Sequence, residues 1–160
     1  MPPKARITKE MILDTVLDLT RKQGFESVNA RSIAAQLRCS TQPIFTCYAN
    51  MEEMKREFLT FAYAFYENYV QRYGQTFQGD PCLVLPLSYI AFAQQETHVF
   101  QLLFVHDMEL DMAEAKDFYR EAGNGTKAEA FAKALGLPVE QGRRVFLDLF
   151  FYAHGIAVLS

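Results

Sequence analysis

Apolar residues recur at intervals of three and four along most of the chain, which is the spacing of an amphipathic helix. Alternating apolar and polar stretches, typical of strands, are absent from the sequence. The breaks between apolar runs carry residues that begin or end helices. The pattern therefore predicts an all-α fold, with a three-helix unit at the N-terminus followed by a longer helical body.

The first 50 residues are predicted to form three helices with capping residues at their starts. Thr8 is placed to cap the first helix, which ends at Gly24 because glycine accepts a positive φ. Asn29 is placed to cap a second helix and Ser40 a third, with only a tripeptide between these two. Their apolar stripes are Ile12, Val16 and Leu19, then Ile33, Ala34 and Leu37, then Ile44 and Tyr48.

A long helix is expected to open the body of the protein. Asn50 and Glu53 have the spacing of a capping box, and the apolar period behind them continues to about Tyr73. Gly74 is expected to begin the linker that follows. Pro86 lacks an N–H, so the next helix must begin near Val84 or kink.

The remaining helices are shorter, except for the last. Thr97 is placed to cap a short helix reaching Phe104, and an acidic amphipathic segment follows over residues 109–122. A small helix opening at Thr126 is expected to end at Gly136, and Pro138 then begins an apolar helix at the C-terminus.

The composition predicts a bulky aromatic core, and the charge distribution indicates a basic N-terminal end. The 160 residues are 50% hydrophobic and include 14 Phe and 8 Tyr but no Trp, enough for a packed interior. The net charge is −3, yet residues 1–56 hold nine Lys or Arg against six acids, and the rest holds seven against thirteen. This asymmetry makes the N-terminal part the candidate for contact with nucleic acid.

Several classes of protein are disfavoured by the pattern. The longest apolar stretches, 81–93 and 145–159, fall short of the roughly 20 residues of a membrane helix, so no membrane contact and a cytoplasmic location are expected. Three widely spaced cysteines form no C-x-x-C pair, which predicts reduced thiols rather than a disulfide or zinc site. No metal or cofactor is expected.

The segment from Ile7 to Leu59 resembles the N-terminal domain of the TetR family of bacterial transcriptional regulators. The resemblance runs through Gly24-Phe25, residues 29–34, the segment Ser40-Thr41-Gln42-Pro43-Ile44-Phe45-Thr46-Cys47-Tyr48, and residues 50–54. It implies a helix-turn-helix domain over residues 1–50 and an effector-binding and dimerisation domain over residues 51–160. In this arrangement the third helix enters the major groove of DNA.

The same resemblance implies a set of DNA-contacting residues. Arginine can bridge guanine, glutamine can bridge adenine, and threonine can contact thymine. Two alternatives stay open: Arg31 as a solvated charge on the second helix, and Pro43 as a residue that only sets the backbone angle. The residues are Arg31, Ser40, Thr41, Gln42, Pro43, Phe45, Thr46, Cys47 and Met51.

Three of these residues depart from the family pattern. Phe45 stands where the family usually has a Tyr, Cys47 where it has His or Tyr, and Met51 where it has Lys. Each change removes a group that contacts phosphate, so we expect modest affinity for DNA and a weak salt dependence. Compensating cations are available on the N-terminal arm and beyond it: Lys4, Arg6, Lys9 and Lys55.

The C-terminal part resembles one subgroup of the same family. Residues 89–93, 99–104 and 151–157 carry this similarity, the last with an aromatic residue ahead of His154-Gly155. It implies an apolar effector cavity with a few polar groups, although an aromatic stripe at helical spacing is also typical of a plain core. The candidate lining is Phe61, Phe65, Tyr89, Phe92, His98, Phe100, Phe104, Phe150, Tyr152 and His154.

These observations predict a TetR-like repressor that is not an enzyme. A homodimer would bind a pseudo-palindromic operator in double-stranded DNA and release it when a hydrophobic or aromatic small molecule binds. Two alternatives remain. One is a dimeric ligand-binding interaction module with weak or lost DNA binding. The other is a small helical enzyme on a hydrophobic substrate, for which the sequence offers no nucleophile with a nearby base and no phosphate loop.

The length of the chain bears on the dimer. The family usually has one more helix after the one that contains His154, and those two helices form its dimer interface. We therefore expect either a chain truncated at its C-terminus or a dimer built from one helix per subunit plus other surfaces.

Overall fold

The computed structural model describes residues 6–106, 114–120 and 123–160, and over these ranges the protein is all-helical, without strands. The predicted all-α class is thus confirmed. The chain divides into two compact units. Unit 1 comprises Met1–Glu67 and Glu96–Asp107, and unit 2 comprises Asn68–Gln95 and Met108–Ser160. The expected functional boundary after residue 50 is a different division and stays a prediction.

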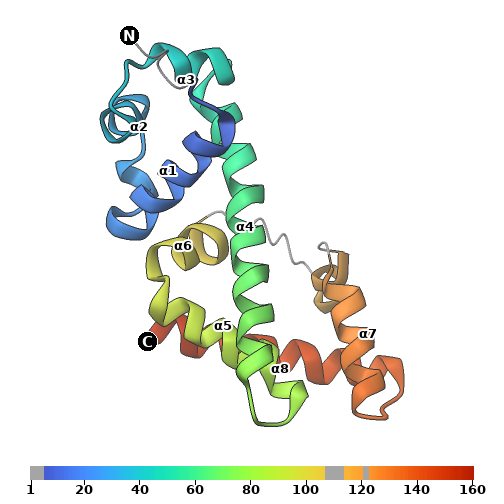
Figure 1. The fold of residues 1–160 in the computed structure, drawn as a ribbon. Helices are drawn as coiled ribbons and strands as arrows, with labels where there is room; N and C mark the ends of the chain where they lie inside the picture. Colours follow the sequence, from blue (N-terminus) through green and yellow to red (C-terminus); the bar gives the residue numbers. More distant parts are fainter. Residues whose placement is uncertain (1–5, 107–113, 121–122) are drawn as a thin grey trace. The chain divides into compact units, whose positions relative to one another are not determined.

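Unit 1 contains the three predicted N-terminal helices and the first part of a long helix (Figure 1). The helix α6 continues directly into a π-helical turn, η3. The elements are α1 (Lys9–Gln23), η1 (Phe25–Ser27), α2 (Ala30–Leu37), α3 (Gln42–Cys47), α4 (Met51–Thr76, which ends in unit 2), α6 (Thr97–Gln101) and η3 (Leu102–His106).

Side-chain caps define the helix starts in unit 1. The Thr8 hydroxyl accepts a hydrogen bond from the Met11 N–H at 3.2 Å. The Asn29 side chain accepts from the N–H groups of Arg31 and Ser32, each at 3.0 Å, and the Ser32 hydroxyl accepts from the Asn29 N–H. Both caps were predicted, and both satisfy donors that the first helical turn leaves without partners.

The predicted cap of α3 is wrong. Thr41, not Ser40, precedes the helix, and neither side chain caps it. Pro43 occupies the first turn, where its missing N–H costs nothing. The connection from α2 is consequently one residue longer than expected, and it begins with Arg38 at φ +54°.

The core of unit 1 forms where α1 to α4 meet. Phe58 of α4 is fully buried, and its ring stacks on Phe25 with the centroids 5.6 Å apart. Thr20 is the one fully buried polar side chain among the described residues of this unit, and its hydroxyl donates to the Val16 carbonyl at 2.7 Å. The other fully buried side chains here include Ile12, Val16, Ile33, Ile44 and Val99.

Unit 2 packs its helices around Phe118 and the middle of the last helix. Gly142 permits a close approach of α7 and α8, because a Cβ at this position would overlap Ala132. The elements are the end of α4, η2 (Pro81–Leu83), α5 (Val84–Gln95), η4 (Ala115–Arg120), α7 (Asn124–Ala134) and α8 (Val139–Leu159).

Boundaries in unit 2 differ from the sequence-based ones by a few residues. The helix α4 passes through Gly74 to Thr76, so the linker is shorter than predicted. The helix α5 begins at Val84, which leaves Pro86 in the first turn as expected. Residues 109–113 and 121–122 of the predicted acidic segment lie outside the described residues, and residues 115–120 form a 3-10 turn. No helix in the described ranges is long and apolar enough to cross a bilayer.

Removing the Asn29 cap should lower the stability of the helix-turn-helix unit. Asn29→Ala leaves two N–H groups of α2 without their side-chain acceptor, so the free energy of unfolding should fall by about 1 kcal/mol in chemical denaturation. Ser40→Ala is the matched control, because Ser40 caps nothing, and it should change stability by less than about 0.5 kcal/mol. Equal losses for the two variants would contradict the assigned cap.

Candidate nucleic-acid interface and effector pocket

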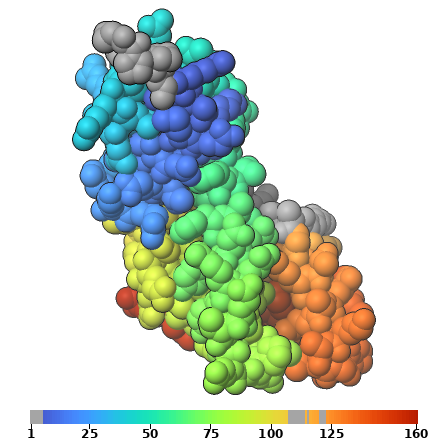
Figure 2. Space-filling model, viewed as in Figure 1, coloured from blue at the N-terminus to red at the C-terminus, as the bar shows by residue number. Residues whose placement is uncertain are grey.

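The helix α3 presents a mixed polar and aromatic face to solvent. Gln42, Phe45 and Thr46 are exposed, and Phe45 leaves 50% of its surface in contact with solvent. The Thr46 hydroxyl donates to the Gln42 carbonyl at 3.0 Å, which leaves its oxygen able to accept. Arg31, at the start of α2, is also exposed and forms no ion pair within the described residues. Figure 2 shows these N-terminal segments, in blue to cyan, at the surface of unit 1.

The opposite face of α3 is anchored in the core. Ile44 is fully buried, and Tyr48, the residue after the helix, is 1% exposed. A helix of six residues is too short to be stable on its own, so its position depends on these buried contacts. The outward residues are therefore held by side chains on the inward face.

An ion pair braces the C-terminal end of α3. Lys9 Nζ lies 2.7 Å from Glu57 Oε2 and 4.6 Å from the centroid of the Tyr48 ring. The hydrogen bond to Glu57 raises the pKa of Lys9, and burial raises the pKa of the Tyr48 phenol. The pair therefore stays charged beside a neutral phenol, and it links α1, the end of α3 and α4.

Two residues expected to face DNA, Cys47 and Met51, are half-buried in the structure and not fully exposed. The Cys47 thiol lies 3.9 Å from the Ile7 carbonyl and donates toward it. Met51, in the first turn of α4, is also partly covered. Two of the expected compensating cations are already engaged, Lys9 with Glu57 and Lys55 over the Phe25 ring at 5.5 Å. Lys4 lies outside the described residues.

A second set of contacts ties the C-terminal end of α1 to α6. The Arg21 guanidinium donates two hydrogen bonds of 2.7 Å to the Glu96 carboxylate, whose side chain is 11% exposed. This hydrogen bonding raises the pKa of Arg21. His98 Nδ1 donates to the Arg21 carbonyl at 3.1 Å, since a carbonyl can only accept. His98 therefore hydrogen-bonds to a carbonyl in the last turn of α1, although it was expected to line a cavity.

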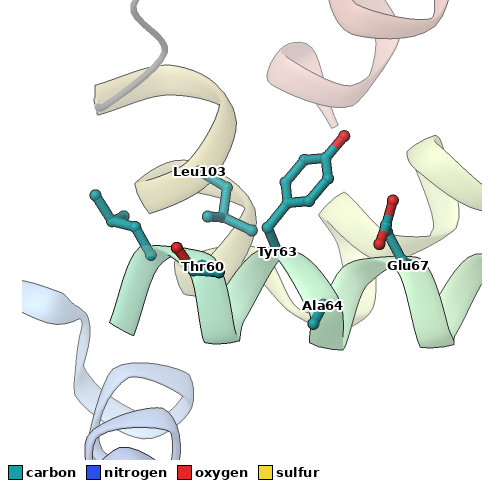
Figure 3. Close-up of a pocket in the computed structure, with 6 residues that line it drawn as sticks. Thr60, Tyr63, Ala64, Glu67 and Leu103 are labelled. Carbon is teal, nitrogen blue, oxygen red and sulfur yellow. The ribbon is translucent and has the colours of Figure 1, made fainter. Parts of the chain in front are cut away.

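Unit 1 contains a pocket of about 450 Å³ between α4 and η3 (Figure 3). Tyr63 and Glu67 rise from the same side of α4, and Leu103 of η3 points toward them. None of the ten residues predicted to line the effector cavity is among its lining residues. These are Leu59, Thr60, Tyr63, Ala64, Glu67 and Leu103.

The predicted cavity aromatics of unit 1 serve mainly as packing. Phe100 is 2% exposed, and Phe65 lies 5.6 Å from the Arg21 guanidinium. Phe104 contacts Tyr63 and Tyr66 edge-on, with centroids 6.4 Å and 4.9 Å away. Phe104 thus supports a tyrosine that lines the pocket.

The predicted cavity residues of unit 2 include one polar pair. The Tyr89 hydroxyl lies 2.9 Å from Nδ1 of His154, and the Phe150 ring stacks on the imidazole. Phe92 is fully buried and meets Tyr69 edge-on. Tyr152, by contrast, is 74% exposed. A role for these side chains in ligand binding stays a prediction.

Sequence reasoning missed the pocket because it followed aromatic residues. Four of the six lining residues are Leu, Thr or Ala, and a fifth is an acid. Positions 59, 60, 63, 64 and 67 lie along one face of a helix. Spacing alone does not single out this face, because every helix has such a set of positions.

Comparison with known proteins adds no family to this description. No protein-family profile matches the chain, and neither does any curated protein.

The Tyr89–His154 pair should make stability depend on pH. Burial lowers the pKa of His154 below its usual 6.5, so below about pH 6.5 the unfolded chain binds a proton that the folded chain resists. The free energy of unfolding should therefore fall between about pH 7.5 and about pH 5, and less so in His154→Gln. His106→Gln removes an exposed histidine as a control. Identical pH slopes for the protein and for His154→Gln would rule out this role.

Proposed function

We propose that the protein is a ligand-responsive, DNA-binding transcriptional regulator of the TetR type, acting as a repressor rather than an enzyme. The observation that carries the proposal is the pair α2 and α3, with α3 anchored by Ile44 and Tyr48 and its other face open. Two short helices joined by a tight turn and backed by a longer helix suit insertion of the second into a major groove.

The open face supplies groups that can recognise bases. Gln42 can bond both the N6 and N7 positions of adenine, and Arg31 can bond guanine in the same bidentate way. Phe45 and the Thr46 methyl group suit contact with thymine methyls. Lys9 is already paired with Glu57 and Lys55 lies over the Phe25 ring, so in this proposal base contacts contribute a larger share of affinity than phosphate contacts do.

The helix α4 connects the pocket with the end of the proposed recognition helix α3. Tyr63 and Glu67 lie on the same continuous helix, α4, whose residue Glu57 braces the end of α3. In the proposed mechanism a ligand between α4 and η3 shifts α4 and thereby α3. Since the coupling is reciprocal, DNA and ligand weaken each other's binding by the same factor.

A homodimer completes the proposal, because two recognition helices are needed to read a pseudo-palindrome. The helix α8 carries an exposed apolar stripe of Val145, Tyr152, Ile156 and Leu159, spaced by seven, four and three residues. At Gly155, beside this stripe, no described atom lies within 4 Å of where a Cβ would be. The stripe supports pairing of two α8 helices, one from each copy.

Binding to DNA tests the function directly. In a gel shift with DNA flanking the protein's own gene, the protein should give a retarded band, and Arg31→Ala or Gln42→Ala should each weaken binding by about 1–3 kcal/mol. Arg72→Ala is the control, since Arg72 lies near the end of α4 in unit 2 and should leave binding unchanged. No retardation, or equal effects of all three variants, would leave the interaction-module alternative in place of this proposal.

The dimer should depend on the α8 stripe. Ile156→Lys places a charge on the stripe and should shift the protein toward monomer in sedimentation velocity. Val158→Lys is a matched control, because Val158 is equally exposed at 51% but two residues away and therefore on another face of α8. Monomeric wild-type protein at micromolar concentration, or a dimer insensitive to Ile156→Lys, would reject this interface.

A further inference from the structure

The pocket between α4 and η3 has a definite chemical character. Leu59, Ala64 and Leu103 provide aliphatic surface, and Tyr63 adds an aromatic ring to the lining. The Thr60 hydroxyl lies 3.5 Å from the Arg56 carbonyl, and its oxygen and the Glu67 carboxylate can both accept hydrogen bonds. The pocket therefore offers an apolar surface together with hydrogen-bond acceptors.

The single formal charge in the lining is negative. Glu67 belongs to the lining and is exposed, and within the described residues it forms no ion pair. None of the six lining residues is basic. A ligand with an anionic group would face an uncompensated carboxylate, whereas a cationic group would be paired.

We infer that this pocket binds an amphipathic amine, a molecule with one protonated amino group and an apolar, preferably aromatic, body. The ammonium group would pair with Glu67 while the body lies against the aliphatic residues. Tyr63 adds to this preference, because a cation is attracted to the face of an aromatic ring. Its ring is held in place by Phe104 and Tyr66, whose centroids lie 6.4 Å and 5.8 Å away. A volume of about 450 Å³ suits a small molecule of this kind.

The inference has two separable parts. Binding of the amine concerns the pocket alone, whereas its effect on DNA rests on the proposed function. We therefore test binding on the full chain without DNA, by titration calorimetry with three probes of similar shape. Phenylbutylamine is cationic, phenylbutanol is neutral and phenylbutyrate is anionic at neutral pH.

The amine should bind most tightly and the anion most weakly. Glu67→Gln should weaken amine binding by about fivefold, the size of an exposed charge pair, and should remove most of the preference over the alcohol. Ala64→Phe, which adds a ring to an exposed position of the lining, should weaken binding of all three probes. Glu52→Gln removes a carboxylate from the first turn of the same helix and should leave binding unchanged.

Each result decides the inference. Equal or tighter binding of the alcohol or the anion, no binding of any probe, or equal effects of Glu67→Gln and Glu52→Gln would overturn it. If the amine binds with the expected preference but the protein retards no DNA, the pocket assignment holds and the proposed function fails. If the protein retards DNA but ignores the amine, the proposed function holds and this inference fails.

Discussion

The position of α3 depends on burial of residues at one end of a helix too short to be stable by itself. Six residues form fewer than two turns, so the backbone hydrogen bonds of α3 do not offset the entropy of ordering it. Ile44 and Tyr48 supply the missing stabilisation through their burial in the core of unit 1. The Lys9 ammonium lies over the Tyr48 ring and pairs with Glu57 of α4, which adds an exposed contact at the end of α3. The orientation of the exposed face of α3 therefore depends on buried residues that face the core, so a change in the core of unit 1 would alter the position of α3.

The same dependence makes α4 and α6 suitable to carry a signal within unit 1. A flexible segment between the pocket and the N-terminal helices would absorb a ligand-induced shift. No such segment interrupts α4, because it is one continuous helix from Met51 past Glu67. A second connection runs through the bidentate pair of Arg21 with Glu96, in which the Glu96 carboxylate is 11% exposed and the Arg21 side chain is 47% exposed. His98 adds a hydrogen bond to the end of α1. In the proposed mechanism these directional contacts would pass a shift of one helix to the next within unit 1.

Sequence patterns predicted elements better than sites, and the reason is physical. Helix caps could be predicted because they act within three or four residues along the chain. The structure contains the expected caps at Thr8, Asn29 and Asn50. Ser40 was misjudged because Pro43 can begin a helix without a capping side chain. The pocket was not predictable from residue type, since its walls come from α4 and from Leu103, some forty residues apart in sequence and brought together only by packing. The π-helical turn at Leu102–His106, which contains Leu103, departs from the 3.6-residue period and has no local sequence signature.

The charge distribution constrains how such a protein can bind DNA. A basic excess in residues 1–56 suggests phosphate contacts, yet Lys9 is paired with Glu57 and Lys55 lies over Phe25. In the proposed function, a phosphate that drew Lys9 away from Glu57 would remove an exposed ion pair beside Tyr48, so Lys9 could not serve both contacts at once. In the proposed function, pairing of two copies through the apolar stripe of α8 would bring two α3 helices to one operator. The second α3 would then bind at a high effective concentration once the first is bound, so the dimer would add affinity without any new contact on α3.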